Sequence, residues 1–278
     1  MNMHIHSISR LFALPLILSA AYIGYVSYGS HYSHSYLIFI PVTLLVALYV
    51  FHGPIDHWWL SKYPIPLDAP LKKWLELYFA PYKTFTSDLK NRFEQRLMLY
   101  LEGRLFESVG KERQEVPEDI KAMVAAHGVH MSLSFADYLL GDMDRIYLYK
   151  HPFPSPAHPF LHTVETHSED GVIILSLEQA TNAVLFPSDY YNIVYHAYAE
   201  AIIATQKKIQ WPQSPEDSWD LITQISGWEK EVFQSQTGFE NLPLLPVWIT
   251  IFFTHKENVS KKAPGLHQSF SDIFSLHA

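Results

Sequence analysis

The chain has 278 residues, of which 48% are apolar and 15% aromatic, and it contains no cysteine. This length accommodates one sizeable domain and a smaller part, and the apolar content exceeds that of an ordinary soluble protein. The lack of cysteine excludes disulfides and cysteine-ligated metals. A formal net charge of −8, with no run of lysine or arginine, argues against a nucleic-acid partner.

Apolar residues are concentrated at the start of the chain. The segments 11–28 and 36–52 carry no Asp, Glu, Lys or Arg. At about 1.5 Å per residue, helices of this length approach the roughly 30 Å of a membrane's hydrocarbon core. We therefore predict a transmembrane helical hairpin over residues 1–53. A cleaved signal peptide is the alternative for the first segment, but a second apolar segment follows and no small-residue cleavage site is evident.

The distribution of lysines predicts the orientation of this hairpin. The turn at residues 29–35 has no lysine or arginine, whereas the second segment is followed by Lys62, Lys72, Lys73 and Lys83. Positively charged flanks of membrane helices remain on the cytoplasmic side. We therefore expect a two-pass protein of the bacterial inner (cytoplasmic) membrane, with a cytoplasmic C-terminal domain.

The rest of the chain predicts a linker followed by a mixed domain. Prolines from Pro54 to Pro81 predict an interfacial linker over residues 54–84. Apolar spacings of three and four residues predict helices over residues 85–106, 117–135, 189–208, 216–236 and 245–255, and one more after Pro264. Short β-branched and aromatic runs predict strands at residues 145–149 and 171–177. Residues 85–278 are therefore expected to form an α+β domain, mostly helical with a small sheet.

Several stretches of this domain carry a resemblance to a known family. They are PEDIKAMVAAHGVHMSLSFADYLLGDMDRIYLYKHPF, GVIILSLEQA followed by DYYNIVYHAYAEAI, SGWEKEV, and FFTHKENVSKKAPGLHQSF. In this order they resemble the Mlc titration factor A family of zinc-dependent peptidases. The resemblance covers residues 85–278 and implies a zincin-like fold of the gluzincin type.

The stretch NIVYHAYAEAI, residues 192–202, resembles the metal-binding helix of that family. In a zincin this helix reads HExxH: two histidines bind zinc, and the glutamate takes a proton from the bound water. The resemblance places the first ligand on His196, the general base on Ala197 and the second ligand on Glu200. Alanine cannot accept a proton. The third ligand falls near Pro243, and the nearby carboxylate is Glu240, three residues early.

His196 and Glu200 nevertheless share one face of a helix, because they are four residues apart. We favour a pair of side chains that bond each other or their neighbours in a polar pocket. A non-catalytic zinc ion is one alternative, if a third ligand arrives from elsewhere, and residual peptidase activity is another. We therefore expect no catalytic residue and no cofactor, with zinc at His196 and Glu200 as the alternative.

A second group of candidate ligands lies between the two predicted strands. It comprises His151, His158, His162, Glu165 and His167. His158 and His162 are four residues apart, but Pro159 argues against a regular helix between them. We expect solvated loop side chains here rather than a metal site.

Together these features predict a membrane-anchored pseudopeptidase that acts as an accessory, structural or binding subunit of an inner-membrane protein complex. The hairpin would bind an integral membrane protein through its small and polar residues, Ser19, Ala20, Ala21, Gly24 and Ser27. The former cleft would hold a protein or peptide, and no nucleic acid. The alternatives are a membrane-anchored zinc-dependent aminopeptidase and, as the resemblance implies, a regulator that sequesters a transcriptional repressor.

Overall fold

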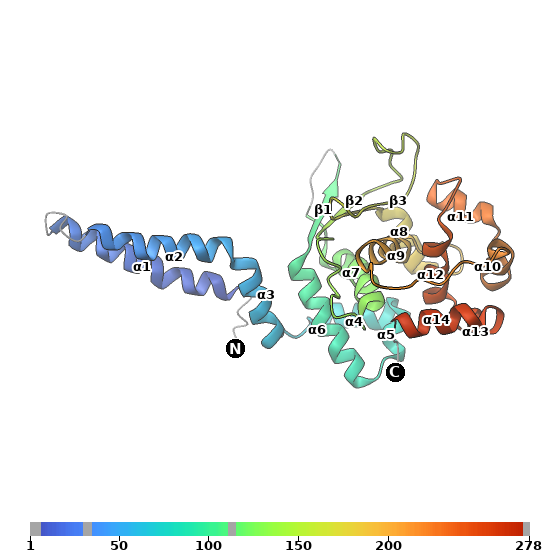
Figure 1. Cartoon of the computed structure of the whole chain (residues 1–278), viewed down its shortest axis with the longest axis horizontal. Coiled ribbons are helices and arrows are strands. Elements are labelled where there is room, and N and C mark those ends of the chain that lie inside the picture. Colours follow the sequence, from blue (N-terminus) through green and yellow to red (C-terminus); the bar gives the residue numbers. More distant parts are fainter. Residues whose placement is uncertain (1–6, 30–34, 111–114, 275–278) are drawn as a thin grey trace. The chain divides into compact units, whose positions relative to one another are not determined.

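The computed structural model describes residues 7–29, 35–110 and 115–274. The chain divides into two compact units, Met1–Pro66 and Leu67–Ala278. Figure 1 colours the whole chain from blue at the N-terminus to red at the C-terminus.

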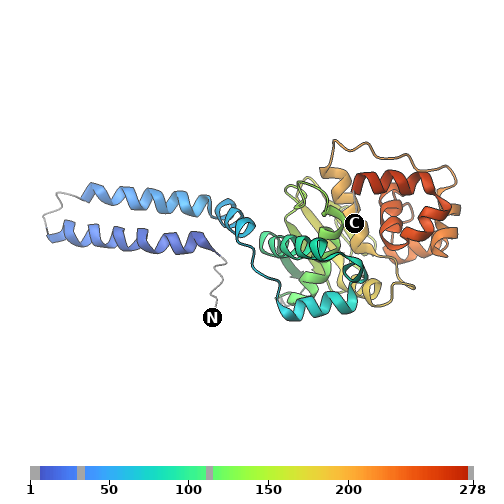
Figure 2. The ribbon, with the colours of Figure 1, turned by 90° about the horizontal axis from the view of Figure 1, so that it is seen from below.

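The first unit consists of helices α1 (Ile8–Gly29), η1 (Ser35–Ile38), α2 (Phe39–Val50) and α3 (His52–Lys62). Helices α1 and α2 lie side by side and run in opposite directions (Figure 2). Within the described residues, only α1 is by itself long and apolar enough to cross a membrane. The structure therefore contains one helix near the N-terminus that is long and apolar enough to span a membrane.

The second predicted span, residues 36–52, is not one continuous helix. Its segments η1 and α2 are followed by a bend of 68° into α3. The bend has a local cause, because Pro54 lacks an N–H and its ring would clash with the carbonyl of Val50 in an uninterrupted helix. The two-span hairpin is thus seen only in part: one helix of spanning length beside a shorter apolar helix.

Residues 54–84 also differ from the predicted linker. They contain most of α3, then α4 (Ala69–Tyr78) and α5 (Ala80–Thr84), and Leu75, Phe79 and Tyr82 are buried in the core of the second unit. Pro70 and Pro81 are the second residues of α4 and α5, in the first turn, where the missing N–H is not needed. These two prolines therefore lie at helix starts instead of preventing helices, and the second unit starts at residue 67.

The second unit contains a four-stranded sheet with the order β1-β2-β4-β3. Its strands are β1 (Leu105–Val109), β2 (Arg145–Tyr149), β3 (Val164–His167) and β4 (Val172–Ser176). Strands β1, β2 and β4 are parallel, and β3 pairs with β4 in the antiparallel direction at one edge. The predicted strands at 145–149 and 171–177 are confirmed as β2 and β4, whereas β1 and β3 were not predicted.

Helices form the rest of this unit and confirm the expected mostly helical α+β class. They are α6 (Ser87–Gly103), α7 (Glu118–Ser132), α8 (Leu177–Leu185), α9 (Ile193–Thr205), α10 (Ser218–Ser226), α11 (Lys230–Thr237), α12 (Leu244–Thr254), α13 (Lys256–Lys262) and α14 (Pro264–Phe274). Helix α9 packs against α7, α12 and strand β3, so the candidate metal-binding helix runs through the core (Figure 1).

Candidate functional site

The position of α9 is set at its first turn. The side chain of Asn192 accepts a hydrogen bond from the backbone N–H of Tyr195 at 3.0 Å, which caps the helix. Residues 193–199 are then all buried. Ala197, at the place of the general base, is 0% exposed, so neither its side chain nor bulk water supplies a proton acceptor there.

His196 is buried, and both of its ring nitrogens face protein atoms. Nδ1 lies 2.8 Å from the hydroxyl of Tyr191, and Nε2 lies 3.5 Å from Oε1 of Glu200. Burial raises the pKa of Tyr191, so its hydroxyl keeps its proton. Both ring nitrogens of His196 are therefore in contact with protein groups, the Tyr191 hydroxyl at Nδ1 and the Glu200 carboxylate at Nε2.

Glu200 is charged in this arrangement. Burial alone would raise the pKa of its carboxyl, but the hydrogen bond and positive charge of His196 outweigh burial and hold the pKa below its usual value. The charge of His158 acts in the same direction. The predicted His196–Glu200 pair is therefore brought together, and it is connected electrostatically to the histidine-rich segment before β3.

The structure places no carboxylate at the expected third-ligand position. Pro243 is the residue that precedes α12 and offers no side-chain donor atom, while Glu240 is exposed in the preceding turn. Among residues 7–29, 35–110 and 115–274, no group of three or more histidine, aspartate or glutamate side chains is placed to hold a metal ion. The residues present at His196 and Glu200 therefore do not make a complete zinc site.

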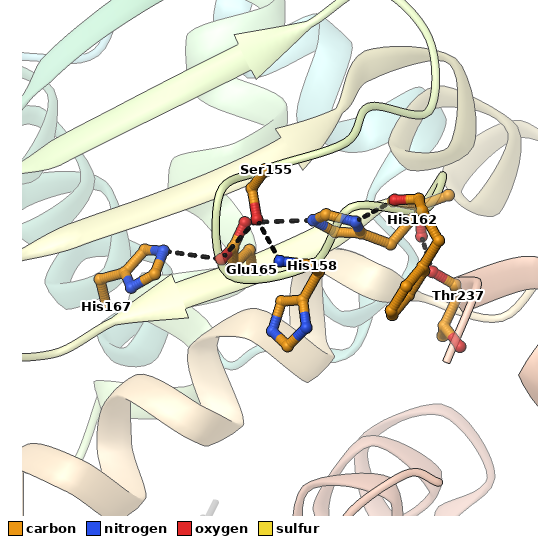
Figure 3. A network of polar contacts seen from close by, with 8 residues as sticks. Ser155, His158, His162, Glu165, His167 and Thr237 are labelled. Carbon is orange, nitrogen blue, oxygen red and sulfur yellow. Dashed lines mark hydrogen bonds and ion pairs between the residues drawn. The ribbon is translucent and has the colours of Figure 1, made fainter. Parts of the chain in front are cut away.

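The second group of candidate ligands forms a polar network around Glu165, with Ser155, His162 and His167 pointing toward its carboxylate (Figure 3). Oε1 lies 3.1 Å from the hydroxyl of Ser155 and 2.9 Å from Nε2 of His167. Oε2 lies 3.1 Å from Nε2 of His162. Burial alone would raise the pKa of Glu165, but these hydrogen bonds and the charges of the two histidines lower it.

The expectation that these side chains are solvated was wrong for two of them. His162 is 0% and Glu165 5% exposed, and Glu165 and His167 lie on strand β3, not in a loop. His162 is also within 3.0 Å of the carbonyl oxygen of Phe160 through Nδ1. Both of its ring nitrogens therefore face acceptors. His151, in contrast, is exposed and pairs with Glu178 at 2.7 Å.

This network is held in place by the end of α11. The N–H of Thr163 donates to the carbonyl of Thr237 at 3.0 Å, and the Thr163 hydroxyl donates to the carbonyl of Gln236 at 3.0 Å. The Gln236 side chain accepts a hydrogen bond from the N–H of Tyr191 and donates to the carbonyl of Asp189. The segment that carries His162 and the residue that orients His196 are thus fixed to the same helix end.

Replacing Glu165 by glutamine tests how much this network stabilises the fold. The substitution removes a buried charge that three donors face, so we expect Glu165→Gln to lower the free energy of unfolding by about 1–3 kcal/mol. Urea denaturation monitored by circular dichroism measures it. The control is Glu178→Gln, which breaks an exposed pair and should cost less than about 1 kcal/mol. Equal effects would mean that the Glu165 network adds nothing to stability.

Two further buried polar side chains lie on α7 and were not anticipated. His127 contacts the carbonyl of Met123 at 2.7 Å and the amide of Asn192 at 3.1 Å. His130 lies 2.7 Å from the hydroxyl of Tyr195. Burial lowers their pKa values to about 4 and about 3, so both are neutral at pH 7. A signal in the sequence was available, because both histidines interrupt the otherwise apolar run MVAAHGVHM.

Comparison with known proteins adds no assignment to these observations: no family model matches the chain, and no curated protein matches it. The resemblance to the Mlc titration factor A family stays a prediction that rests on the quoted motifs.

Proposed function

We propose that this chain is a membrane-anchored pseudopeptidase, a non-catalytic binding or accessory subunit of an inner-membrane protein complex. The main support for the proposal is the pair of contacts that His196 makes, with Tyr191 on one side and Glu200 on the other, next to Ala197. A zinc hydrolase needs a base next to the metal-bound water and ligand atoms with free lone pairs. In this unit Ala197 occupies the position of the base, and the two ring nitrogens of His196 face the Tyr191 hydroxyl and the Glu200 carboxylate.

The membrane part of the proposal rests on α1 and its neighbours. Helix α1 crosses the membrane once, and η1 with α2 forms the shorter second pass, which leaves the C-terminal unit in the cytoplasm. The small residues of α1, such as Ala20 and Gly24, let a helix of a partner approach closely. The C-terminal unit then binds a protein or peptide without cleaving it.

The absence of zinc chemistry is tested on the full chain purified in detergent. After dialysis of the protein against a zinc-containing buffer, we expect less than one bound zinc ion per chain. We also expect no hydrolysis of small peptides that a chelator inhibits. His196→Ala and Glu200→Gln should leave both readouts unchanged. Zinc retained in a ratio near one to one, with peptide cleavage that His196→Ala abolishes, would overturn the proposal in favour of a membrane-anchored zinc aminopeptidase.

The accessory role is tested by extraction from native membranes at native abundance. A gentle detergent should bring out an integral membrane protein in a constant ratio to this chain, and a size measurement should show one complex. A monomer under the same conditions would count against the accessory role without bearing on the zinc result.

A further inference from the structure

The first turn of α1 is tied to α3 by one carboxylate. Oδ1 of Asp56 accepts a hydrogen bond from the backbone N–H of Ser9 at 2.8 Å. Oδ2 accepts from the hydroxyls of Ser9 at 2.7 Å and Ser7 at 2.8 Å. The N–H groups of a first helical turn have no partner within the helix, and a negative charge there is favourable. Asp56 therefore fixes α3 against the start of α1.

The two faces of α3 differ in character. Asp56 and Leu60 are one turn apart; Asp56 bonds the start of α1, and Leu60 is only 5% exposed. On the other side Trp58 is 53% exposed, and Tyr63, which directly follows the helix, is 58% exposed. The ammonium of Lys62 lies 4.8 Å from the centre of the Trp58 ring. Exposed aromatic rings beside a lysine are the combination that favours the headgroup layer of a bilayer, where an apolar body and a polar end are both accommodated.

The lengths of the helices place α3 at the boundary of the apolar layer. Helix α1 has 22 residues, which corresponds to about 33 Å and matches a hydrocarbon core of roughly 30 Å. Because α1 and α2 are antiparallel (Figure 2), the start of α1 and the end of α2 lie at the same end of the first unit. The contact between Ser9 and Asp56 joins these two ends, and the chain turns by 68° there.

We infer that α3 is an interfacial anchor that lies along the membrane surface and binds phospholipid headgroups through Trp58, Lys62 and Tyr63, with Asp56 as the residue that sets its position. This inference rests on the proposed membrane anchoring by α1 and α2. The bent pair of helices α2 and α3 allows two arrangements, and this inference selects the one in which α3 lies on the membrane surface. The other, a broken span, would place the charges of Asp56 and Lys62 inside hydrocarbon, which is unfavourable for ionised groups.

The test measures the depth of single nitroxide labels in the full chain, reconstituted into vesicles of phosphatidylcholine and phosphatidylglycerol. The chain has no native cysteine, so every label reports only the introduced position. Ser61→Cys places the label on the exposed side of α3, Val46→Cys on α2, and Ser168→Cys in the exposed turn between β3 and β4. Collision rates with oxygen and with a water-soluble nickel chelate give the depth of each label.

We expect the label at position 61 to report headgroup depth, between the deep label at 46 and the aqueous label at 168. An aqueous value at 61, or a value as deep as that at 46, would overturn the interfacial anchor while the deep value at 46 still supported membrane insertion. An aqueous value at 46 would overturn the membrane anchoring itself, and with it this inference.

The role of Asp56 is tested in the same vesicles. Asp56→Ala should raise the nickel collision rate at position 61 toward the value at 168, because α3 is no longer tied to α1. Asp68→Ala is the control, since the Asp68 carboxylate makes no capping hydrogen bond, and it should leave the rate at 61 unchanged. An unchanged rate in Asp56→Ala, with the label at 46 still deep, would exclude a positioning role for Asp56.

Discussion

Substitution of Gly238 by alanine is expected to destabilise the second unit by about 3 kcal/mol or more, because it combines backbone strain with a steric clash. Gly238 ends α11 with a φ of +86°, and an added Cβ would overlap the carbonyl oxygen of Leu161 and lie 2.7 Å from Cα of His162. Both neighbours are backbone atoms, which cannot move aside by a change of rotamer. The segment that carries His162 would therefore have to shift.

Gly227 provides a matched control for this substitution. It ends α10 with a φ of +78°, but an added Cβ would meet no atom within 4 Å. Gly227→Ala should thus cost only the strain of the left-handed conformation, about 1–2 kcal/mol. Urea denaturation gives both free energies, and the NMR signals of His162 and His167 report the network around Glu165.

The expected pattern is a large loss of stability with perturbed His162 and His167 signals for Gly238→Ala, and a small loss with unchanged signals for Gly227→Ala. Equal losses of stability in the two variants would show that the backbone near Leu161 moves aside at little energetic cost. In that case the close approach of the end of α11 to the segment before β3 would not be what holds the Glu165 network.

The sequence predicted those elements whose pattern is local. Strands β2 and β4 are short hydrophobic runs between turn residues, and α7, α9 and α12 repeat apolar residues with helical spacing. Strand β1 was missed because its residues LFESV directly follow α6 and continue the helical pattern, and β3 because VETH is short and polar. The prediction of one helix over 216–236 failed at Gly227, where a left-handed residue ends α10.

The candidate site shows the same division between local and distant information. The contact between His196 and Glu200 follows from their spacing on one helix, and it was predicted. The contact of the Tyr191 hydroxyl with Nδ1 of His196 was not, because Tyr191 comes from the turn before α9. The burial of His162 and Glu165 depends on Thr163 meeting the end of α11, more than 70 residues along the chain. No sequence pattern within residues 151–167 predicts that contact.

The largest pH effect is expected from His127 and His130. Their folded-state pKa values are about 4 and about 3, below the ordinary value near 6.5. The unfolded chain therefore binds protons at these histidines as the pH falls below about 6.5, while the folded chain does not. Above about pH 6.5 both histidines are neutral in the folded and in the unfolded chain, so they do not lower the free energy of unfolding there. The free energy of unfolding decreases as the pH falls from about 6.5 toward the folded-state pKa values.

Between pH 7 and pH 5 the two histidines together should lower the free energy of unfolding by about 3–4 kcal/mol. Glu165 and Glu200 also have lowered pKa values, but their contribution is lost only as the pH falls below about 4.5, so the two effects fall in different pH windows. Urea denaturation of the full chain in detergent at intervals between pH 7.5 and pH 4.8 measures the histidine window alone.

Substitution identifies the groups responsible for this acid sensitivity. His127→Gln and His130→Gln each replace a titrating ring by a neutral amide, so each should lower stability at pH 7 yet remove about half of the decrease between pH 7 and pH 5. The control is His151→Gln, which replaces an exposed histidine outside α7 and should keep the decrease that the two α7 histidines cause. If stability is constant between pH 7 and pH 5, or if the double variant keeps the full decrease, the two α7 histidines are not buried in the neutral form that their contacts with Met123, Asn192 and Tyr195 require.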